Sequence, residues 1–290
     1  MDVKTITMQL PILADDAFLA DVERARTQTD RLHIWWLGQS GFLVQWQGCH
    51  LLFDPYLSDS LTRKYAATDK PHVRMTGRVI APERLAVVDV VTSSHNHTDH
   101  LDAETLKPLC AANPALQLVI PAANRPFVAD RLGCEPGWLL GLDAGETITV
   151  GAFTLTAVPA AHEALERDGQ GRHCYLGFVV HCGPCTIYHS GDTVLYDGMA
   201  EILRPFAVDV ALLPINGRSP ERRVAGNLDG RTAAELAHAI GAGIAIPCHY
   251  DMFTFNTATP DLFVSTCAAM GQPYHILRNG ERWSSADLAR

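Results

Sequence analysis

The feature that most restricts how this chain can fold is a dense group of metal-binding side chains. Residues 92–102 read TSSHNHTDHLD and directly follow the apolar run LAVVDVV. The cluster has the spacing H-x-H-x-D-H, formed by His95, His97, Asp99 and His100. Buried imidazoles and carboxylates packed this closely repel one another or go unpaired without a cation. We therefore expect a buried strand to end at a metal site.

Three more polar residues follow apolar segments in the same way. His162 comes after TLTAVPA, Asp192 after CTIYHSG, and His249 after GIAIPC. A rigid strand end can aim a side chain at a common point, and functional residues concentrate at such positions. The sequence therefore predicts that these three residues converge on the H-x-H-x-D-H cluster.

The spacing within the cluster favours two ions. A tight turn can point His95 and His97 at one ion while Asp99 and His100 turn toward a second. Neutral imidazole and carboxylate are ligands for zinc, manganese or iron, whereas calcium prefers oxygen alone. We interpret several other histidines as ordinary core or surface residues: His33, His50, His173, His181, His189, His238 and His275.

Segments rich in β-branched and aromatic residues alternate with helical patterns along the chain. Strands are expected within 32–38, 41–46, 49–55, 87–94, 116–121, 146–160, 175–182, 185–191, 208–215 and 243–248. Helices are expected at 15–28, 102–112, 124–132, 195–203, 230–241 and 260–270. Asp229 is the expected cap of helix 230–241, and Pro108 predicts a kink or a late start in helix 102–112.

Two parts of the chain repeat one plan. GFLVQWQGCHLLFDPY and LGFVVHCGPCTIYHSGDT both read strand, turn, strand, aspartate, and VVDVVTSSHNH has a counterpart in AVDVALLPING. This repetition predicts an α+β fold, a four-layer αββα sandwich with two similar halves in a single domain over residues 1–290. The motif Cys182 to Cys185, HCGPC, favours a hairpin turn over a redox or zinc site.

Composition restricts the partners. The net charge of −9 argues against a broad surface for nucleic acid. Asp15 and Asp16 interrupt the apolar residues near the start, so we predict neither a signal peptide nor a membrane segment. Irregularly spaced cysteines are typical of reduced thiols in a cytoplasmic protein. We expect a small-molecule substrate, with no nucleic acid and no membrane as partner, and leave a homo-oligomer open.

The motifs together resemble the metallo-β-lactamase fold superfamily, whose H-x-H-x-D-H motif is present without gaps. The sequence is similar in particular to the branch of L-ascorbate-6-phosphate lactonase and its relatives. WWLGQSGF, DPYLSDS, YHSGDT and IPCHYDMF carry that similarity, which extends from about residue 30 to the end. The resemblance implies a metal-dependent hydrolase of the lactonase or phosphodiesterase type.

The resemblance also implies a role for each residue of the site. It places His95, His97 and His162 on a first metal ion, places Asp99, His100 and His249 on a second, and makes Asp192 the bridge between them. Asp99 and Asp192 are the residues expected to be catalytic, and Asp54 is expected to be a buried acceptor that orients a ligand histidine. Around His162, VPAAHE departs from the lactonase pattern and leaves the substrate open.

The expected cofactors are two divalent transition-metal ions, Mn²⁺ or Zn²⁺, with iron as a further choice. Two such ions lower the pKa of bound water toward ~7 and supply hydroxide for attack on a lactone or phosphoester. A diiron oxidoreductase on the same fold is an alternative. Such enzymes usually carry the motif H-x-E-x-D-H, and in this chain Asn96 stands where that glutamate would be. A metal-binding protein without turnover is a second alternative.

Substrate selection has to come from segments outside the ligand set. Residues 55–79 lack a clean periodicity, which predicts a functional loop or lid, and residues 216–231 are a second candidate. The predicted substrate-binding residues are Arg63, Lys64, Arg218, Asn227, Tyr250 and Asp251. Basic residues in these two segments of an acidic chain favour an anionic substrate.

Overall fold

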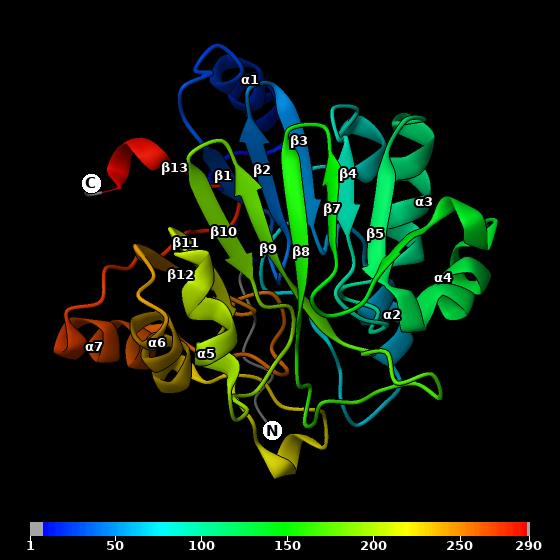
Figure 1. The fold of residues 1–290 in the computed structure, drawn as a ribbon. Coiled ribbons are helices and arrows are strands. Elements are labelled where there is room, and N and C mark those ends of the chain that lie inside the picture. Colours follow the sequence, from blue (N-terminus) through cyan, green and yellow to red (C-terminus); the bar gives the residue numbers. More distant parts are fainter. Residues whose placement is uncertain (1–7, 289–290) are drawn as a thin grey trace.

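Two β-sheets face each other at the centre of the molecule (Figure 1). The computed structural model describes residues 8–288. In the first sheet the strand order is β13-β1-β2-β3-β4-β5-β6. Its strands are β1 (His33–Trp36), β2 (Phe42–Trp46), β3 (Cys49–Phe53), β4 (Val90–Thr92), β5 (Gln117–Pro121), β6 (Leu140–Leu142) and β13 (Arg282–Ser284).

The second sheet has the order β12-β11-β10-β9-β8-β7. Its strands are β7 (Thr147–Val150), β8 (Phe153–Pro159), β9 (Leu176–Cys182), β10 (Cys185–His189), β11 (Val210–Pro214) and β12 (Ile244–Cys248). Strands β10, β11 and β12 run parallel, as do β3, β4 and β5 in the first sheet. Their carboxyl ends therefore define one end of each sheet.

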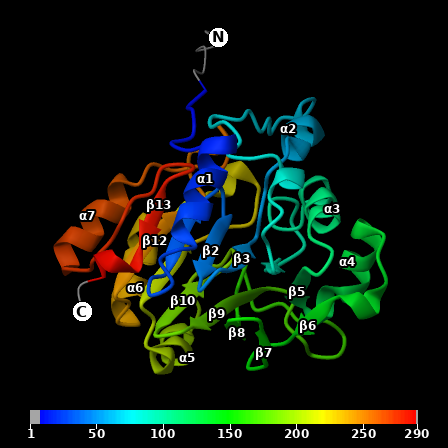
Figure 2. The same ribbon diagram turned by 90° about the horizontal axis from the view of Figure 1, so that it is seen from above.

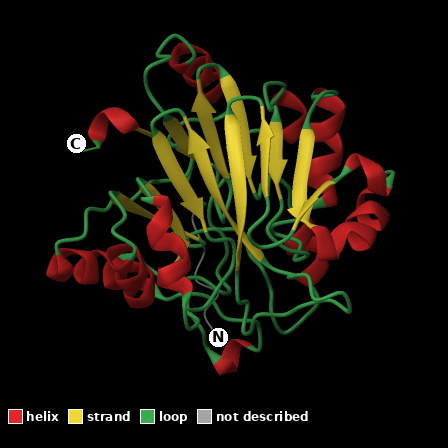
Figure 3. Cartoon of the chain, in the orientation of Figure 1, coloured by secondary structure: helices red, strands yellow, loops and turns green. Residues whose placement is uncertain are grey.

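Helices cover the outer faces of both sheets (Figure 3). Seen from above, α3 and α4 lie on one side of the molecule and α6 and α7 on the other (Figure 2). The helices are α1 (Asp15–Ala25), α2 (Ser60–Tyr65), α3 (Ala103–Ala112), α4 (Arg125–Leu132), α5 (Met199–Leu203), α6 (Gly230–Ala239) and α7 (Asp261–Met270). The predicted αββα sandwich is confirmed, while the extent of the domain over residues 1–290 stays a prediction.

The alternation of side chains along a strand explains the layers. In β1, Ile34 and Trp36 belong to the core between the sheets, whereas Trp35 belongs to the second core under the helices. Successive side chains of a strand point to opposite faces, so a strand covered on both faces is apolar throughout. This is why HIWW contains three large apolar residues in a row and why all four positions are buried.

The two halves repeat one topology, as predicted. The hairpin β2–β3 is followed by the parallel strands β4 and β5, and the hairpin β9–β10 is followed by β11 and β12. Cys182 pairs directly with Cys185 at the end of the second hairpin, which confirms the turn predicted for HCGPC. The repeat places equivalent strand ends of the two sheets at the same site.

The differences from the predicted elements are local. Helix α2 lies inside the segment 55–79 that we predicted as a loop, and the short edge strands β6 and β13 were not predicted. Helix α3 begins at Ala103 and continues through Pro108, so of the predicted kink or late start the late start is wrong and the kink stays a prediction. Asp229 caps α6 as predicted, because its carboxylate accepts the backbone N–H of Thr232. Within residues 8–288, every helix is too short or too polar to cross a membrane.

Candidate metal centre

The residues predicted to bind metal lie just beyond the carboxyl ends of β4, β8, β10 and β12. The first predicted group, His95, His97 and His162, has ligand atoms that all lie within 4.8 Å of one another. His162 is oriented by the carbonyl of Gly226, 2.9 Å from Nδ1, and His95 by the Ser94 hydroxyl, 3.0 Å from Nδ1. Nε2 of His95 is therefore kept for a ligand, and Nε2 of His162 faces Nδ1 of His97, another member of the group, at 3.2 Å.

The second group is equally close. Asp99, His100, Asp192 and His249 offer ligand atoms within 4.8 Å of one another. Nε2 of His249 lies 3.4 Å from Asp99 Oδ2 and 3.5 Å from Asp192 Oδ2. Asp192 Oδ2 is also 3.8 Å from Nε2 of His162, which belongs to the first group. Asp192 thus occupies the place between the groups where a bridging carboxylate would be needed.

Asp54 lies behind the centre, at the end of β3. Its carboxylate accepts hydrogen bonds from Nδ1 of His100 at 2.7 Å, from the Thr92 hydroxyl at 2.8 Å and from the backbone N–H of Ser94 at 3.1 Å. With Nδ1 held in this way, Nε2 of His100 faces Asp192 Oδ1 at 3.3 Å. The structure therefore places Asp54 where it can orient a ligand histidine, as predicted.

The pKa values of the residues in the centre are set by burial and by the charges of close neighbours. Burial lowers the pKa of His95 well below its usual value, and the neighbouring His100 and His97 lower it further. Burial would also lower the pKa of His249, but Asp192 and Asp99 raise it to about 9. For Asp192, burial is outweighed by His100 and His249, so its pKa lies well below the usual range. The carboxylates therefore draw positive charge into the centre.

Nε2 of His95 is buried and has no hydrogen-bond partner among the described residues, and the buried Nε2 of His100 and Oδ1 of Asp192 face each other at 3.3 Å without good hydrogen-bond geometry. Buried polar atoms are nearly always satisfied, so such a group calls for an ion or a ligand. Imidazole nitrogen and carboxylate oxygen suit zinc, manganese or iron. The residues of this chain therefore fit a pair of transition-metal ions.

Residues 50–250 match the family model of the beta-lactamase superfamily domain. A metal-dependent hydrolase of the UPF0173 family from Methanosphaerula palustris is 33% identical over 179 residues, which cover 60% of this chain and 74% of that protein. The chain belongs to the β-lactamase superfamily, among the UPF0173 metal-dependent hydrolases.

Two further comparisons cover more of the chain. A UPF0173 metal-dependent hydrolase from Opitutus terrae is 28% identical over 255 residues, 86% of this chain and 98% of that protein. The structure of Igni18, a metallo hydrolase from Ignicoccus hospitalis, superposes with a TM-score of 0.63 at 20% identity and covers 88% of this chain and 98% of its own. The structural match supports the fold, and the lactonase resemblance stays a prediction.

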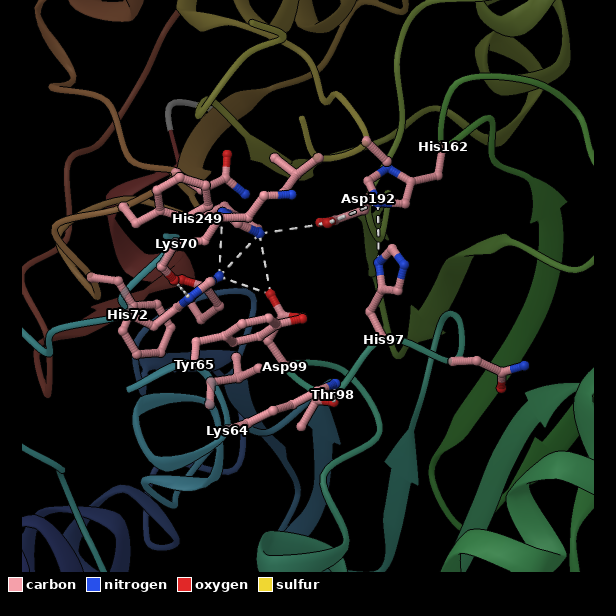
Figure 4. Close-up of a pocket in the computed structure, with 18 of the residues that line it drawn as sticks. Lys64, Tyr65, Lys70, His72, His97, Thr98, Asp99, His162, Asp192 and His249 are labelled. Carbon is pink, nitrogen blue, oxygen red and sulfur yellow. Dashed lines mark hydrogen bonds and ion pairs between the residues drawn. The ribbon is translucent and has the colours of Figure 1, made fainter. Parts of the chain in front are cut away.

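In the present chain, the candidate metal centre opens into a cavity of about 350 Å³. In Figure 4, His97 and His162 lie on one side, and Lys64, Tyr65, Lys70 and His72 lie on the other. Arg131, Arg223, Phe253 and Phe255 also line the cavity, together with Gln39 and Asn96. Lys70 donates to the carbonyl of Arg223 at 2.6 Å, so the predicted segments 55–79 and 216–231 meet at the cavity.

Of the predicted substrate-binding residues, Lys64 lines the cavity and the other five do not. Arg63 points outward from α2 and pairs with Glu104. Arg218 pairs with Glu163, whose carboxylate also accepts the N–H of Gly226. Arg218 thus helps to hold the loop that carries the acceptor for His162.

Packing keeps the remaining three residues out of the cavity wall. Asn227 is buried and donates to the side chain of Asn216. Tyr250 points away from its neighbour His249, stacks on Trp36 at 4.6 Å and donates its hydroxyl to a backbone carbonyl. Asp251 lines a separate cavity beside Tyr250.

Sequence reasoning missed several residues of the cavity wall. Lys70 and His72 lie in the segment 55–79 that we had identified, and only their side-chain direction was unknown. Arg131 comes from α4 and donates to the carbonyl of Asn96 at 2.7 Å, a contact with no local sequence signal. Gln39 stands in the motif WWLGQSGF, and that motif was the available signal.

Proposed function

We propose that this chain hydrolyses a lactone or phosphoester of a small anionic molecule, as in enzymes similar to L-ascorbate-6-phosphate lactonase. The observation that carries the proposal is the charge of the cavity wall. Apart from the proposed metal ligands Asp99 and Asp192, the charged residues that line the cavity are all basic: Lys64, Lys70, Arg131 and Arg223. The chain as a whole has a net charge of −9, so this concentration of positive charge is local.

Lys64 is the best placed of these cations to meet a substrate. Its ammonium lies 3.5 Å from the Thr98 hydroxyl, and within residues 8–288 it has no carboxylate partner. Arg223, in contrast, pairs with Asp69, and Arg131 is occupied by backbone carbonyls. An ammonium without a counter-ion at the mouth of a metal centre favours an anionic group on the substrate.

The cavity also has an aromatic wall that suits the organic part of a small molecule. The ring of His72 stacks on Tyr65 at 4.5 Å and lies 5.2 Å from Phe253 and 5.1 Å from Phe255. Burial lowers the pKa of His72, so this imidazole contributes a neutral surface. Apolar walls with a few placed polar groups are typical of small-molecule sites.

The proposed chemistry divides between the ions and the protein. When bound, two divalent ions lower the pKa of water to ~7 and polarise the electrophile. The chain holds the ligands in place: Asp54 fixes His100, Gly226 fixes His162, and Asp192 lies between both groups. No serine or cysteine nucleophile is needed, and Lys64 would orient the anionic end of the substrate.

A substrate panel tests the reaction class. Phosphorylated sugar lactones, neutral lactones, bis-p-nitrophenyl phosphate and a β-lactam are assayed at equal concentration with the metal-loaded protein. Faster turnover of phosphorylated than of neutral lactones is expected. The reverse order would contradict the anion preference. No turnover across the panel would favour a binding protein, and oxygen consumption with reduced flavin would favour a diiron oxidoreductase.

Two neighbouring residues of α2 provide a matched pair of variants. Lys64→Met should raise KM for an anionic substrate about tenfold, the equivalent of about 1.4 kcal/mol, and leave KM for a neutral one unchanged. Arg63→Met removes a charge one position away that points out of the cavity toward Glu104, and it should change neither. Equal effects of the two variants would show that Lys64 acts only through the general surface charge.

A cytoplasmic location stays a prediction, and the state of assembly stays open.

A further inference from the structure

We propose that Gln39 is an additional ligand of the second metal ion and binds it through the side-chain oxygen. The proposal rests on the two-ion arrangement described above and goes beyond it by adding a residue from the first sheet. Gln39 follows β1, and the residue is only 4% exposed although it lines the cavity.

The position of the amide is the first observation. Nε2 of Gln39 lies 2.9 Å from Oδ2 of Asp99 and 3.0 Å from Nε2 of His249. Both partners belong to the second metal group, and the amide N–H₂ donates to the Asp99 oxygen that an ion would use. The end of the Gln39 side chain therefore occupies the edge of the second ion's position.

The backbone supplies a second, independent observation. Gln39 has φ 51° and His249 has φ 62°, a left-handed conformation that residues with a Cβ adopt uncommonly. The backbone N–H of His249 donates to the carbonyl of Gln39 at 2.9 Å, and the Trp36 indole donates to the same oxygen at 3.0 Å. Two unfavourable backbone positions are thus bonded to each other beside the metal centre, and such outliers concentrate at functional sites.

Coordination chemistry decides which end of the amide faces an ion. A divalent cation repels the N–H₂ group and attracts the carbonyl oxygen, so rotation about the last side-chain bond exchanges Nε2 for Oε1 at the same place. Metal–ligand bonds of about 2.1 Å bring neighbouring ligand atoms to roughly 3 Å from one another. The distances from Gln39 to Asp99 and His249 are of this size. The side chain can therefore serve as a hydrogen-bond donor in the metal-free protein and as an oxygen ligand in the metal-bound protein.

The test measures metal binding, with no dependence on turnover. The full chain is stripped of metal and titrated with Zn²⁺ against a chromophoric chelator, and Co²⁺ spectra report the ligand set. Gln39→Ala should weaken the second ion at least tenfold and leave the first unchanged, and Gln39→Glu, which keeps an oxygen ligand, should restore the affinity. Gln272→Ala is the control, because Gln272 is a buried glutamine that donates to the carbonyls of Ala242 and Pro273.

A ligand and a competitor predict opposite changes in the affinity of Gln39→Ala for the second ion. Tighter binding of the second ion by Gln39→Ala would show that Gln39 only competes with the ion, and this would overturn the proposal. Unchanged affinity for both ions, or a wild-type protein that binds fewer than two, would also overturn it. A wild-type protein that binds two ions but hydrolyses nothing in the panel would contradict the proposed function and leave this inference intact.

Discussion

Asp54→Asn is the substitution that best isolates the support of the metal centre. Asp54 is fully buried and has φ 36°, and asparagine tolerates this left-handed backbone about as well as aspartate does. The variant therefore keeps the shape of the side chain and the backbone preference. It removes the negative charge and replaces one acceptor oxygen with a donor group. The result is a change in the hydrogen bonds around Asp54, with little change in packing.

The size of the effect follows from those bonds. The carboxylate accepts from His100, Thr92 and Ser94, and burial of the charge is outweighed by the His100 contact, which lowers the pKa of Asp54. A hydrogen bond to a charged group contributes about 1.5–3 kcal/mol, and loss of the orienting partner of a metal ligand lowers metal affinity about 10–100-fold. Asp54→Asn should therefore lower the free energy of unfolding by about 3 kcal/mol and weaken the second ion about 10–100-fold.

Two measurements separate these effects. Urea unfolding of the metal-free protein gives the stability, and chelator competition gives the affinity for each ion. Asp102→Ala is the control. Asp102 is also a buried carboxylate near the cluster, but it caps α3 and accepts a hydrogen bond from the Thr105 hydroxyl. It should cost about 1 kcal/mol of stability and leave metal affinity unchanged. Wild-type affinity for both ions in Asp54→Asn would refute the orienting role.

Three more predictions concern other parts of the fold. Asp192→Ala should lower the occupancy of both ions, whereas His95→Ala should chiefly weaken the first; equal ion loss in the two variants, measured by elemental analysis, would contradict the bridging position. Burial lowers the pKa of His50 from 6.5 to about 4, so the unfolded chain takes up a proton that the folded chain does not, and stability falls as the pH is lowered through this range. His50→Gln should reduce the change in unfolding free energy with pH, measured by urea unfolding of metal-free protein, by up to about 1.4 kcal/mol per pH unit. An unaltered pH dependence would show that His50 is not the group responsible. Gly191 has φ 60°, and an added Cβ would lie 2.6 Å from Cβ of Ser94, so Gly191→Ala should lower the free energy of unfolding by more than about 1 kcal/mol; a wild-type melting temperature would contradict the close packing at this turn.

The sequence was a good guide to the sheets and to the converging residues because both depend on local signals. Apolar strands such as LHIWW and VVDVV are recognisable by composition, and polar residues that directly follow them lie at strand ends. His162, Asp192 and His249 could be assigned to the centre on this basis. Short edge strands such as β13, with the three residues RWS, contain too little sequence to give a signal.

The cavity wall was less predictable because it depends on side-chain direction and long-range packing. Tyr250 was chosen because it adjoins His249, but it points away and packs on Trp36. Arg63 and Lys64 are consecutive, yet the turn of α2 places one outside the cavity and the other inside. Arg131 reaches the cavity from a helix whose sequence pattern gives no sign of it.

The central claim is that two groups of ligands on this chain hold two transition-metal ions. Elemental analysis of protein purified without added metal, and again after dialysis against Mn²⁺ or Zn²⁺, tests it most directly. The two groups, His95, His97 and His162 and then Asp99, His100, Asp192 and His249, predict close to two ions per chain. Protein that contains no metal and gains none on dialysis would contradict the account.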